Sequence, residues 1–261
     1  MKVLVKLGGS LLESQPSRER LAAELAAARR EGLELVVVHG GGKQMSRFLA
    51  ERNVASRFVG GLRVTTPEVL DAVIKVVAGS VNRELVATLV AAGARAVGLS
   101  GVDDCLLEAR AMGEELGAVG RPAHANTELL DLLVAHGFLP VIACVGADRQ
   151  GRIYNVNADQ MAAALASGFR ADSLILLTDV GGVLAADGRI LPQLTASQAR
   201  RLIADGVATG GMQAKLEAAI GALEAGVRRI VIAAGAEPGV IARALAGDGP
   251  GTRLIREENL P

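Results

Sequence analysis

The chain has 261 residues, half of them hydrophobic and 21% charged, and Lys+Arg balance Asp+Glu at 28 each. This balance excludes a broad electrostatic attraction to nucleic acid or to an anionic membrane. Aromatic residues make up only 2%, too few for the stacking platforms of single-strand binders. The longest uncharged stretch, residues 132–147, is too short for a membrane span. Lys2 and Lys6 interrupt the first apolar run and there are two cysteines, so we expect a cytoplasmic protein without a signal peptide or disulfides.

Short runs rich in Val, Leu and Ile alternate along the chain with alanine-rich segments of helical character. Most of these runs are apolar on both faces, which is typical of a parallel sheet covered by helices on both sides. The pattern therefore predicts an α/β protein. The predicted strands are residues 3–6, 35–38, 96–99, 139–143, 174–178 and 230–233.

Helix ends and turns can also be located from the sequence. Thr66-Pro67 predicts a helix start, because threonine caps helices and proline suits the first helical position. Residues 195–198 form a capping-box pattern, and Gly206 predicts the end of that helix. Gly151 and Asp187-Gly188 predict hairpin turns in the second half of the chain.

Glycines follow the first two predicted strands. Lys6 and Gly8-Gly9 close the first strand, and His39 with Gly40-Gly41-Gly42 closes the second. Glycine lets backbone N–H groups approach a phosphate closely, and Lys6 adds a positive charge beside them. Neither segment is a P-loop, so tight strand-to-helix turns remain the alternative. We interpret His39 as a structural imidazole bonded to the backbone.

The segment Tyr154–Asp159 is a cluster of polar residues in the second half of the chain. In an extended segment, Asn155, Asn157 and Asp159 would lie on one face, where they could bind a polar substrate or hold lysines. Asp159 could equally cap a helix over residues 160–167, and the two roles are compatible. Arg63, in a turn after two glycines, suits bidentate binding of a carboxylate, with a solvated surface arginine as the alternative.

Two further glycine pairs lie close to charged residues. Asp179 ends a buried strand just before Gly181-Gly182, a position that commonly meets a ribose hydroxyl or a metal. Lys215 follows Gly210-Gly211 near the start of a helix, the end that attracts anions. The alternative for Lys215 is an ordinary solvated lysine.

Taken together, these segments resemble the amino-acid kinase superfamily, and within it the acetylglutamate kinases. KLGG, VHGGG, GLRVT, NVNAD, LLTDV and GGM followed by a lysine occur in that family's order between Lys6 and Lys215. The resemblance implies a three-layer αβα sandwich with an open, mainly parallel eight-stranded central sheet, the carbamate kinase-like fold, in a single domain over residues 1–261. It implies an N-lobe, residues 1–150, for the acyl amino acid and dimerisation, and a C-lobe, residues 151–261, for ATP.

The resemblance also implies an activity, namely ATP-dependent phosphorylation of the side-chain carboxylate of N-acetyl-L-glutamate in arginine biosynthesis. Mg²⁺ would bridge the phosphates, with no metal held by the protein. Lys6 and Lys215 would stabilise the phosphoryl group and the departing ADP, and Asp159 would orient both lysines. The implied binding residues are Gly41, Gly42, Arg63 and Asn155 for the substrate, Gly8 and Gly9 for phosphate, and Thr178, Asp179, Val180, Gly181, Gly182, Val183, Leu184, Val207, Ala208 and Thr209 for the nucleotide.

Two departures from the family pattern bear on regulation. The chain begins almost at its first strand, so we expect a homodimer insensitive to arginine rather than the hexamer of arginine-inhibited members. Residues 101–105 differ from the usual glycine-rich form, which leaves the role of that loop open. The alternative functions are a sister kinase acting on carrier-bound α-aminoadipate and a non-catalytic nucleotide-binding regulator. Lys6, Asp159 and Lys215 favour turnover, because a binding module does not need all three.

Overall fold

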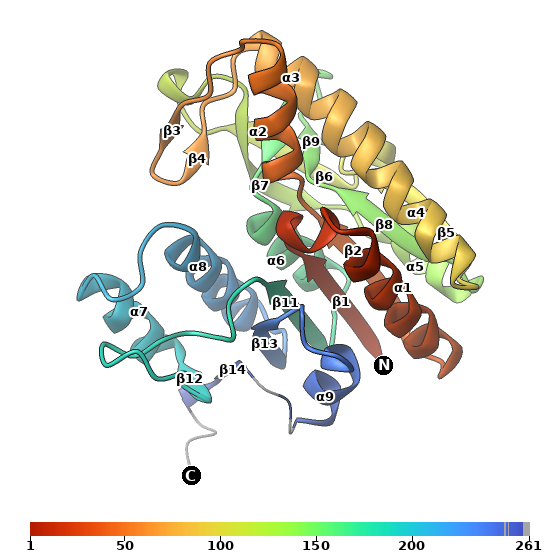
Figure 1. The fold of residues 1–261 in the computed structure, drawn as a ribbon, viewed down its shortest axis with the longest axis vertical. Coiled ribbons are helices and arrows are strands. Elements are labelled where there is room, and N and C mark those ends of the chain that lie inside the picture. The colour runs from red at the N-terminus through yellow and green to blue at the C-terminus, as the bar shows by residue number, and fades with distance from the viewer. Residues whose placement is uncertain (248, 250, 258–261) are drawn as a thin grey trace.

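A single sheet runs through the molecule. The computed structural model describes residues 1–247, 249 and 251–257, and within them the sheet has eight strands (Figure 1). In spatial order these are β12 (Gln193–Thr195), β14 (Thr252–Ile255), β13 (Arg229–Ala234), β11 (Ser173–Thr178), β1 (Lys2–Leu7), β2 (Glu34–His39), β8 (Leu139–Ala143) and β5 (Ala96–Ser100). Neighbouring strands are parallel except β13 and β14, which are antiparallel. The mainly parallel eight-stranded sheet is confirmed, and each of the six predicted strands is part of it.

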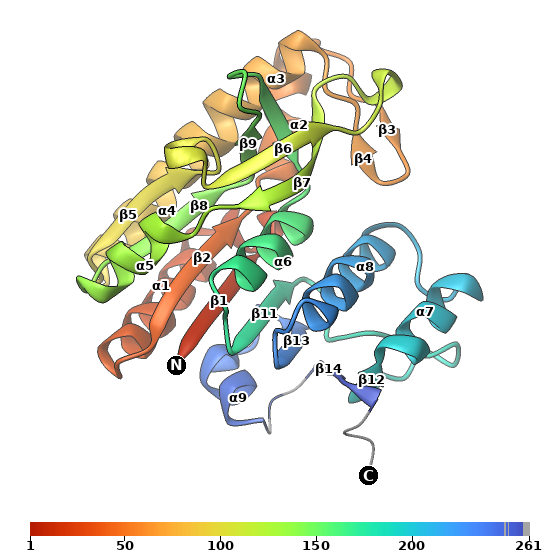
Figure 2. The same ribbon diagram turned by 180° about the vertical axis from the view of Figure 1, so that it is seen from behind.

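Helices cover both faces of this sheet, which is why its central strands are buried almost throughout. The helices are α1 (Gln15–Arg30), α2 (Gly42–Glu51), α3 (Pro67–Val73), the π-helix η2 (Ile74–Val81), α4 (Asn82–Ala91), α5 (Glu128–Ala135), α6 (Ala158–Gly168), α7 (Ala196–Ala204), α8 (Gly210–Glu224) and α9 (Val240–Ala246). Helix α1 packs against α4 and α9 on one face (Figure 1), whereas α5, α6 and α8 cover the other (Figure 2). No helix within the described ranges is both long and apolar enough to cross a membrane.

The predicted helix signals hold in two places and fail in a third. The Thr66 side chain accepts a hydrogen bond from the backbone of Val69 and so caps α3, and Thr195 forms the expected capping box at the start of α7. The helix expected over residues 160–167 begins earlier, at Ala158, and its cap is Asn157, not Asp159. The expected extended face through Asp159 is therefore wrong, because the chain turns into helix one residue before it.

A small closed barrel beside the sheet was not predicted. It consists of β6 (Leu107–Ala111), β7 (Val119–Ala125), β9 (Val145–Ala147) and β10 (Ile153–Val156). The turn at Gly151 does join the antiparallel pair β9 and β10, as expected. An unpredicted hairpin, β3 (Phe58–Val59) and β4 (Leu62–Arg63), places Arg63 on a strand and leaves Gly60-Gly61 as the turn.

The strand order determines where a site can form. Strand β1 lies between β2, which leads to the strands of the first half of the chain, and β11, which leads to those of the second half. All three strands are parallel, so their carboxyl ends meet at one edge. In open α/β sheets, ligands bind at such an edge where the strand order reverses. The glycine turns after β1 and β2 and the residues after β11 therefore lie together.

Candidate active site

Two lysines from different elements share one carboxylate at this edge. Lys6, at the end of β1, lies 2.9 Å from Asp159 Oδ1. Lys215, on α8, donates to Oδ1 at 3.0 Å and to Oδ2 at 2.9 Å of the same side chain. All three residues are at least nine-tenths buried. Two ammonium groups and one carboxylate give the cluster a net charge of plus one. Because the cluster is shielded from bulk water, this charge suits the binding of an anion.

Burial and mutual attraction shift the pKa values in this cluster. Burial, together with repulsion from Lys6, lowers the pKa of Lys215 to about 8, even though Asp159 opposes the change. Burial alone would raise the pKa of Asp159, but the positive charges of Lys6 and Lys215 outweigh it and hold this pKa below its ordinary value. Asp159 is therefore a carboxylate near pH 7 and can hold both lysines.

The glycine turns after β1 and β2 each lead into a helix, and the first turns of these helices lie beside the lysine cluster. Gly9 opens the short 3₁₀ helix η1 (Gly9–Leu12), and Gly42 opens α2 with Gly41 as its cap residue. First-turn N–H groups have no partner in an earlier turn. The two turns are in close contact, since a Cβ on Gly9 would lie 3.1 Å from the nitrogen of Gly42.

Gly8 differs from the other glycines of these turns. Its N–H donates to the carbonyl oxygen of Leu177 at 3.0 Å, so the expected donation from Gly8 to a phosphate is not available in this conformation. Instead, Gly8 joins the end of β1 to the end of β11.

His39 is structural, as the sequence indicated. Its Nδ1 lies 3.0 Å from the carbonyl oxygen of Gly40 and its Nε2 lies 2.9 Å from Asn82 Nδ2. A proton on Nδ1 satisfies both contacts, so the ring is the neutral Nδ1–H tautomer. Burial lowers the pKa of His39 to about 4, although the bond to Gly40 acts in the opposite direction.

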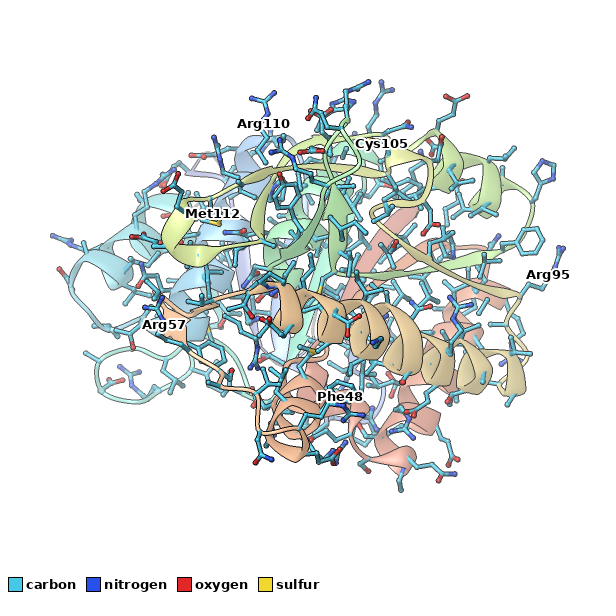
Figure 3. The ribbon with its side chains drawn as sticks, turned by 90° about the horizontal axis from the view of Figure 1, so that it is seen from above. Phe48, Arg57, Arg95, Cys105, Arg110 and Met112 are labelled. Carbon is cyan, nitrogen blue, oxygen red and sulfur yellow. The ribbon has the colours of Figure 1, made fainter. Side chains whose placement is uncertain are left out.

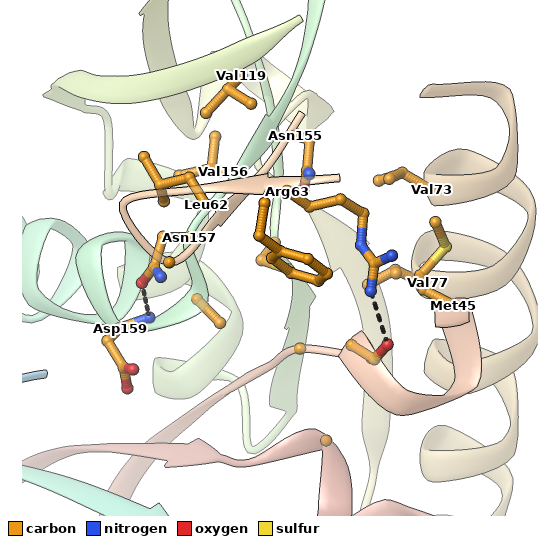
Figure 4. Close-up of a pocket in the computed structure, with 18 of the residues that line it drawn as sticks. Met45, Leu62, Arg63, Val73, Val77, Val119, Asn155, Val156, Asn157 and Asp159 are labelled. Carbon is orange, nitrogen blue, oxygen red and sulfur yellow. Dashed lines mark hydrogen bonds between the residues drawn. The ribbon is translucent and has the colours of Figure 1, made fainter. Parts of the chain in front are cut away.

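A cavity of about 240 Å³ lies between the lysine cluster and Arg63 (Figure 4). Its polar lining includes Lys6, Asp159, Arg63 and Asn155, so the structure brings these predicted residues together. Its other lining residues are Gly9, Gly40, Gly41, Gly42, Met45, Phe58, Gly61, Leu62, Val73, Val77, Val119, Cys144, Val156, Asn157 and Ala158. The cavity thus has charged side chains at both ends, with glycine, apolar and amide residues between them.

Two residues of the cavity wall are Asn155, which is hydrogen-bonded, and Cys144, whose thiol is protonated. Asn155 Nδ2 donates to Thr65 Oγ1 at 3.0 Å. Burial raises the pKa of the Cys144 thiol to about 11, so it is protonated near pH 7 and contributes to packing rather than nucleophilic chemistry. The other cysteine, Cys105, lies at the periphery (Figure 3), and both are free thiols.

The residues expected to bind the nucleotide lie beside this cavity rather than in its lining. Thr178 donates to Asp179 Oδ1 at 3.1 Å at the end of β11. Val180, Leu184 and Val207 expose 41%, 47% and 36% of their surface, so their side chains are accessible to a flat apolar ligand. The buried members of the set are Thr178, Gly182, Val183 and Ala208.

Several wall residues were not foreseen as part of a site. Val73 and Val77 belong to a helical stripe visible in the sequence, which could have been assigned to a cavity as well as to the core. Phe58 and Cys144 carried no local signal, because only the fold brings them to Lys6. No group of three or more His, Cys, Asp or Glu side chains in residues 1–247, 249 and 251–257 is placed to hold a metal ion.

Fold and site together define a class of protein: an α/β sandwich in which glycine turns and two buried lysines that share one carboxylate lie beside a cavity. The sequence profile of the Amino acid kinase family matches residues 1–234. An acetylglutamate kinase of Solibacter usitatus (strain Ellin6076) is 60% identical over 98% of this chain and 99% of its own length. The chain belongs to the amino acid kinase family, on the branch of the acetylglutamate kinases.

Solved structures of other proteins share the fold of this chain. N-acetylglutamate synthase from Neisseria gonorrhoeae, complexed with coenzyme A and N-acetyl-glutamate, superposes with a TM-score of 0.88 at 27% identity, covering 98% of this chain and 59% of that one. Carbamate kinase from Giardia lamblia bound to AMP-PNP has a TM-score of 0.71 at 18% identity, with 98% of each chain covered. The latter likeness confirms the carbamate kinase-like fold.

Proposed function

We propose that this chain transfers the γ-phosphoryl group of ATP to the side-chain carboxylate of N-acetyl-L-glutamate. A carboxylate oxygen attacks the γ-phosphorus, and the bond from that phosphorus to the β,γ-bridging oxygen breaks. The products are ADP and N-acetyl-L-glutamyl 5-phosphate. The observation that carries the proposal is the shared carboxylate of Asp159, which holds Lys6 and Lys215 together beside the cavity. The 60% identity to an acetylglutamate kinase supports the choice of substrate.

The chemistry fits the site because a carboxylate is already a nucleophile and needs no general base. Catalysis of phosphoryl transfer depends on alignment and on charge placed around the transferring group. In this proposal Lys6 stabilises the moving phosphoryl group, Lys215 stabilises the β-phosphate as ADP leaves, and Asp159 orients both. The N–H groups of Gly9, Gly41 and Gly42 donate to phosphate and substrate.

The two ends of the cavity suit the two carboxylates of the acyl amino acid. Arg63 and Asn155 bind the α-carboxylate and its neighbouring atoms, while the side-chain carboxylate points toward Lys6. Residues 178–184 and 207–209 line the nucleotide site. Apart from Asn155, which reaches the acyl amino acid, and the glycine turns, which also reach the phosphate, residues 1–150 bind the acyl amino acid and residues 151–261 bind ATP. Mg²⁺ would be held by the phosphates of the nucleotide. We further propose a cytoplasmic homodimer that serves arginine biosynthesis.

A side-by-side assay of acceptors tests this function. Purified protein with ATP and Mg²⁺ is given N-acetylglutamate, glutamate, N-acetylaspartate or α-aminoadipate, and ADP release and hydroxylamine-trapped acyl phosphate are both measured. Turnover that depends on N-acetylglutamate, with equal amounts of ADP and acyl phosphate, is the expected result. A preference for α-aminoadipate would show that this compound, not N-acetylglutamate, is the acceptor. ATP binding without turnover on any acceptor would identify a nucleotide-binding regulator instead.

A further inference from the structure

The guanidinium of Arg63 is already held from several sides. Its Nη2 donates to the carbonyl oxygen of Gly42 at 3.1 Å and to Ser46 Oγ at 2.8 Å, and its Nη1 donates to Ser56 Oγ. The Phe58 ring centroid lies 4.6 Å from its Cζ. Arginine has five N–H donors, so these contacts leave at least two for a ligand. The group is fixed before any substrate arrives.

Ser46 has a particular place in this arrangement. It lies one turn after Gly42 in α2, and its hydroxyl donates to the Gly42 carbonyl oxygen at 3.0 Å. A serine hydroxyl has a single proton, so with that proton directed to Gly42, Oγ presents its lone pairs to Arg63. Hydroxyl and carbonyl therefore form a paired acceptor for one nitrogen of the guanidinium (Figure 4 shows the bond from Arg63 to Gly42).

We propose that Ser46 is a positioning residue for substrate recognition: it fixes the Arg63 guanidinium against the start of α2 so that the remaining donors meet the α-carboxylate of the acyl amino acid. The inference rests on the proposed function, because it takes Arg63 as the carboxylate-binding group. Gly42 belongs to the turn that donates to the phosphate, so the same contacts connect the α-carboxylate end of the site to the phosphoryl end.

The consequence is a specific effect on recognition. A charge-assisted hydrogen bond stabilises by more than a neutral one, and its loss lets the long arginine side chain sample other rotamers. Removing the Ser46 hydroxyl therefore weakens binding of a substrate that has the α-carboxylate and leaves unchanged the binding of one that lacks it. The suitable probe is 4-acetamidobutyrate, which is N-acetylglutamate without its α-carboxylate.

The experiment compares Ser46→Ala with the parent protein, using both acyl compounds. In Ser46→Ala, kcat/KM for N-acetylglutamate falls about tenfold, mainly through KM, while KM for MgATP is unchanged. The KM or competitive inhibition constant of 4-acetamidobutyrate stays within about twofold, so discrimination between the two compounds falls about tenfold. Ser46→Thr, which keeps the hydroxyl, restores most of the discrimination.

Ser167→Ala is the matched control. Ser167 is also a helical serine that donates to the carbonyl four residues earlier, at 2.9 Å from Ala163, but it lies at the end of α6. If Ser46→Ala does not fold, Ser56→Ala removes the other hydroxyl acceptor, outside α2, and should reduce discrimination in the same direction.

The outcomes separate this inference from the proposed function. The role of Ser46 is overturned if Ser46→Ala, or Ser56→Ala where Ser46→Ala does not fold, discriminates between the two acyl compounds as well as the parent does. It is also overturned if the variant loses affinity equally for both compounds. Either result leaves the kinase function intact. A parent protein without turnover on N-acetylglutamate overturns both.

Discussion

Lys215 contacts both carboxylate oxygens of Asp159, at 3.0 and 2.9 Å, although the two residues lie on different helices. The contact joins α8 to the start of α6, next to the Lys6 ammonium group. An anion that enters between the lysines would meet charges whose positions are already fixed.

Replacing Lys6 by alanine removes a fixed positive charge from the transferring phosphoryl group. We expect kcat to fall by about 10²–10³-fold, or about 3–4 kcal/mol of transition-state stabilisation, with smaller changes in KM. Steady-state kinetics measure this directly. Lys75→Ala, which removes an exposed lysine paired with Asp71, is the control and should keep the parental rate. Turnover near the parental rate in Lys6→Ala would exclude Lys6 from the mechanism.

Asp159→Asn leaves two buried ammonium groups without their counter-charge. Breaking a buried ion pair in this way typically costs about 3–5 kcal/mol. The free energy of unfolding, measured with urea, should therefore decrease by that order in the variant. MgATP should raise the melting temperature of the variant by more than that of the parent, because the phosphates replace the missing negative charge. A variant as stable as the parent, or one with an equal response to MgATP, would contradict the shared-carboxylate arrangement.

The lowered pKa of Lys215 predicts a pH dependence for nucleotide binding. The group is a cation below about pH 8 and loses its proton above it. We therefore expect kcat/KM for MgATP, which reports groups of the free enzyme, to decline as pH rises above about 8. In Lys215→Arg the guanidinium stays charged, so this decline should move to higher pH even if the rate is lower. An unchanged alkaline limb would assign the titration to another group.

The close contact between the two glycine turns predicts the effect of a single methyl group. In Gly9→Ala, the new Cβ would lie 3.1 Å from the nitrogen of Gly42, which pushes the turns apart. We expect kcat/KM for MgATP to fall about tenfold or more, because misplaced donors lose alignment with the phosphoryl group. Gly221→Ala is the control: it lies within α8 with open space around it, and should keep activity and gain some helix stability. Equal kinetics in both variants would show that the turns tolerate separation.

His39 predicts a loss of stability in acid. Its pKa is about 4 in the folded protein, against 6.5 for an ordinary histidine, so the unfolded chain binds more protons between these values. Stability is therefore complete above about pH 6.5 and falls as the pH decreases toward 4. Between pH 7 and pH 5 this group should account for about 2 kcal/mol of the loss in unfolding free energy. Urea titrations of the parent and of His39→Gln measure it, and equal losses in both would assign the effect to other groups.

The parts of the fold that could be predicted are those with a strong local signal. The six predicted strands of the sheet are mostly apolar on both faces, so their burial under helices follows from composition alone. Thr66 and Thr195 are helix caps whose hydrogen bonds involve only the next three residues. The small barrel was not predicted because β9 and β10 have only three and four residues, and because most of β7 is not buried. In addition, β10 pairs with β7, which lies far from it in the chain.

The candidate site divides in the same way. Lys6 and the glycine turns are predicted from strands that end in glycine, and Asp159 is predicted as a group that could hold lysines, which it does. The extended backbone and the helix cap predicted for Asp159 are wrong, because α6 begins at Ala158 with Asn157 as its cap. Arg63 is predicted to bind a carboxylate, but its contacts with Ser46, Ser56 and Phe58 could not be predicted, because they join α2, the following loop and a hairpin. The engaged N–H of Gly8 depends on the pairing of β1 with β11.

The α/β class, the strands and the helix caps follow from the local sequence, as do the kinds of side chain and backbone that suit a phosphate. They depend on apolar runs, glycine and lysine within a few residues of one another. Which of these groups converge follows from the tertiary fold alone. The parallel order of β2, β1 and β11 brings three carboxyl ends to one edge, and the packing of α8 against α6 turns Lys215 toward the carboxylate that holds Lys6. Contacts between distant segments depend on the packing of the whole core, which no short stretch of sequence encodes.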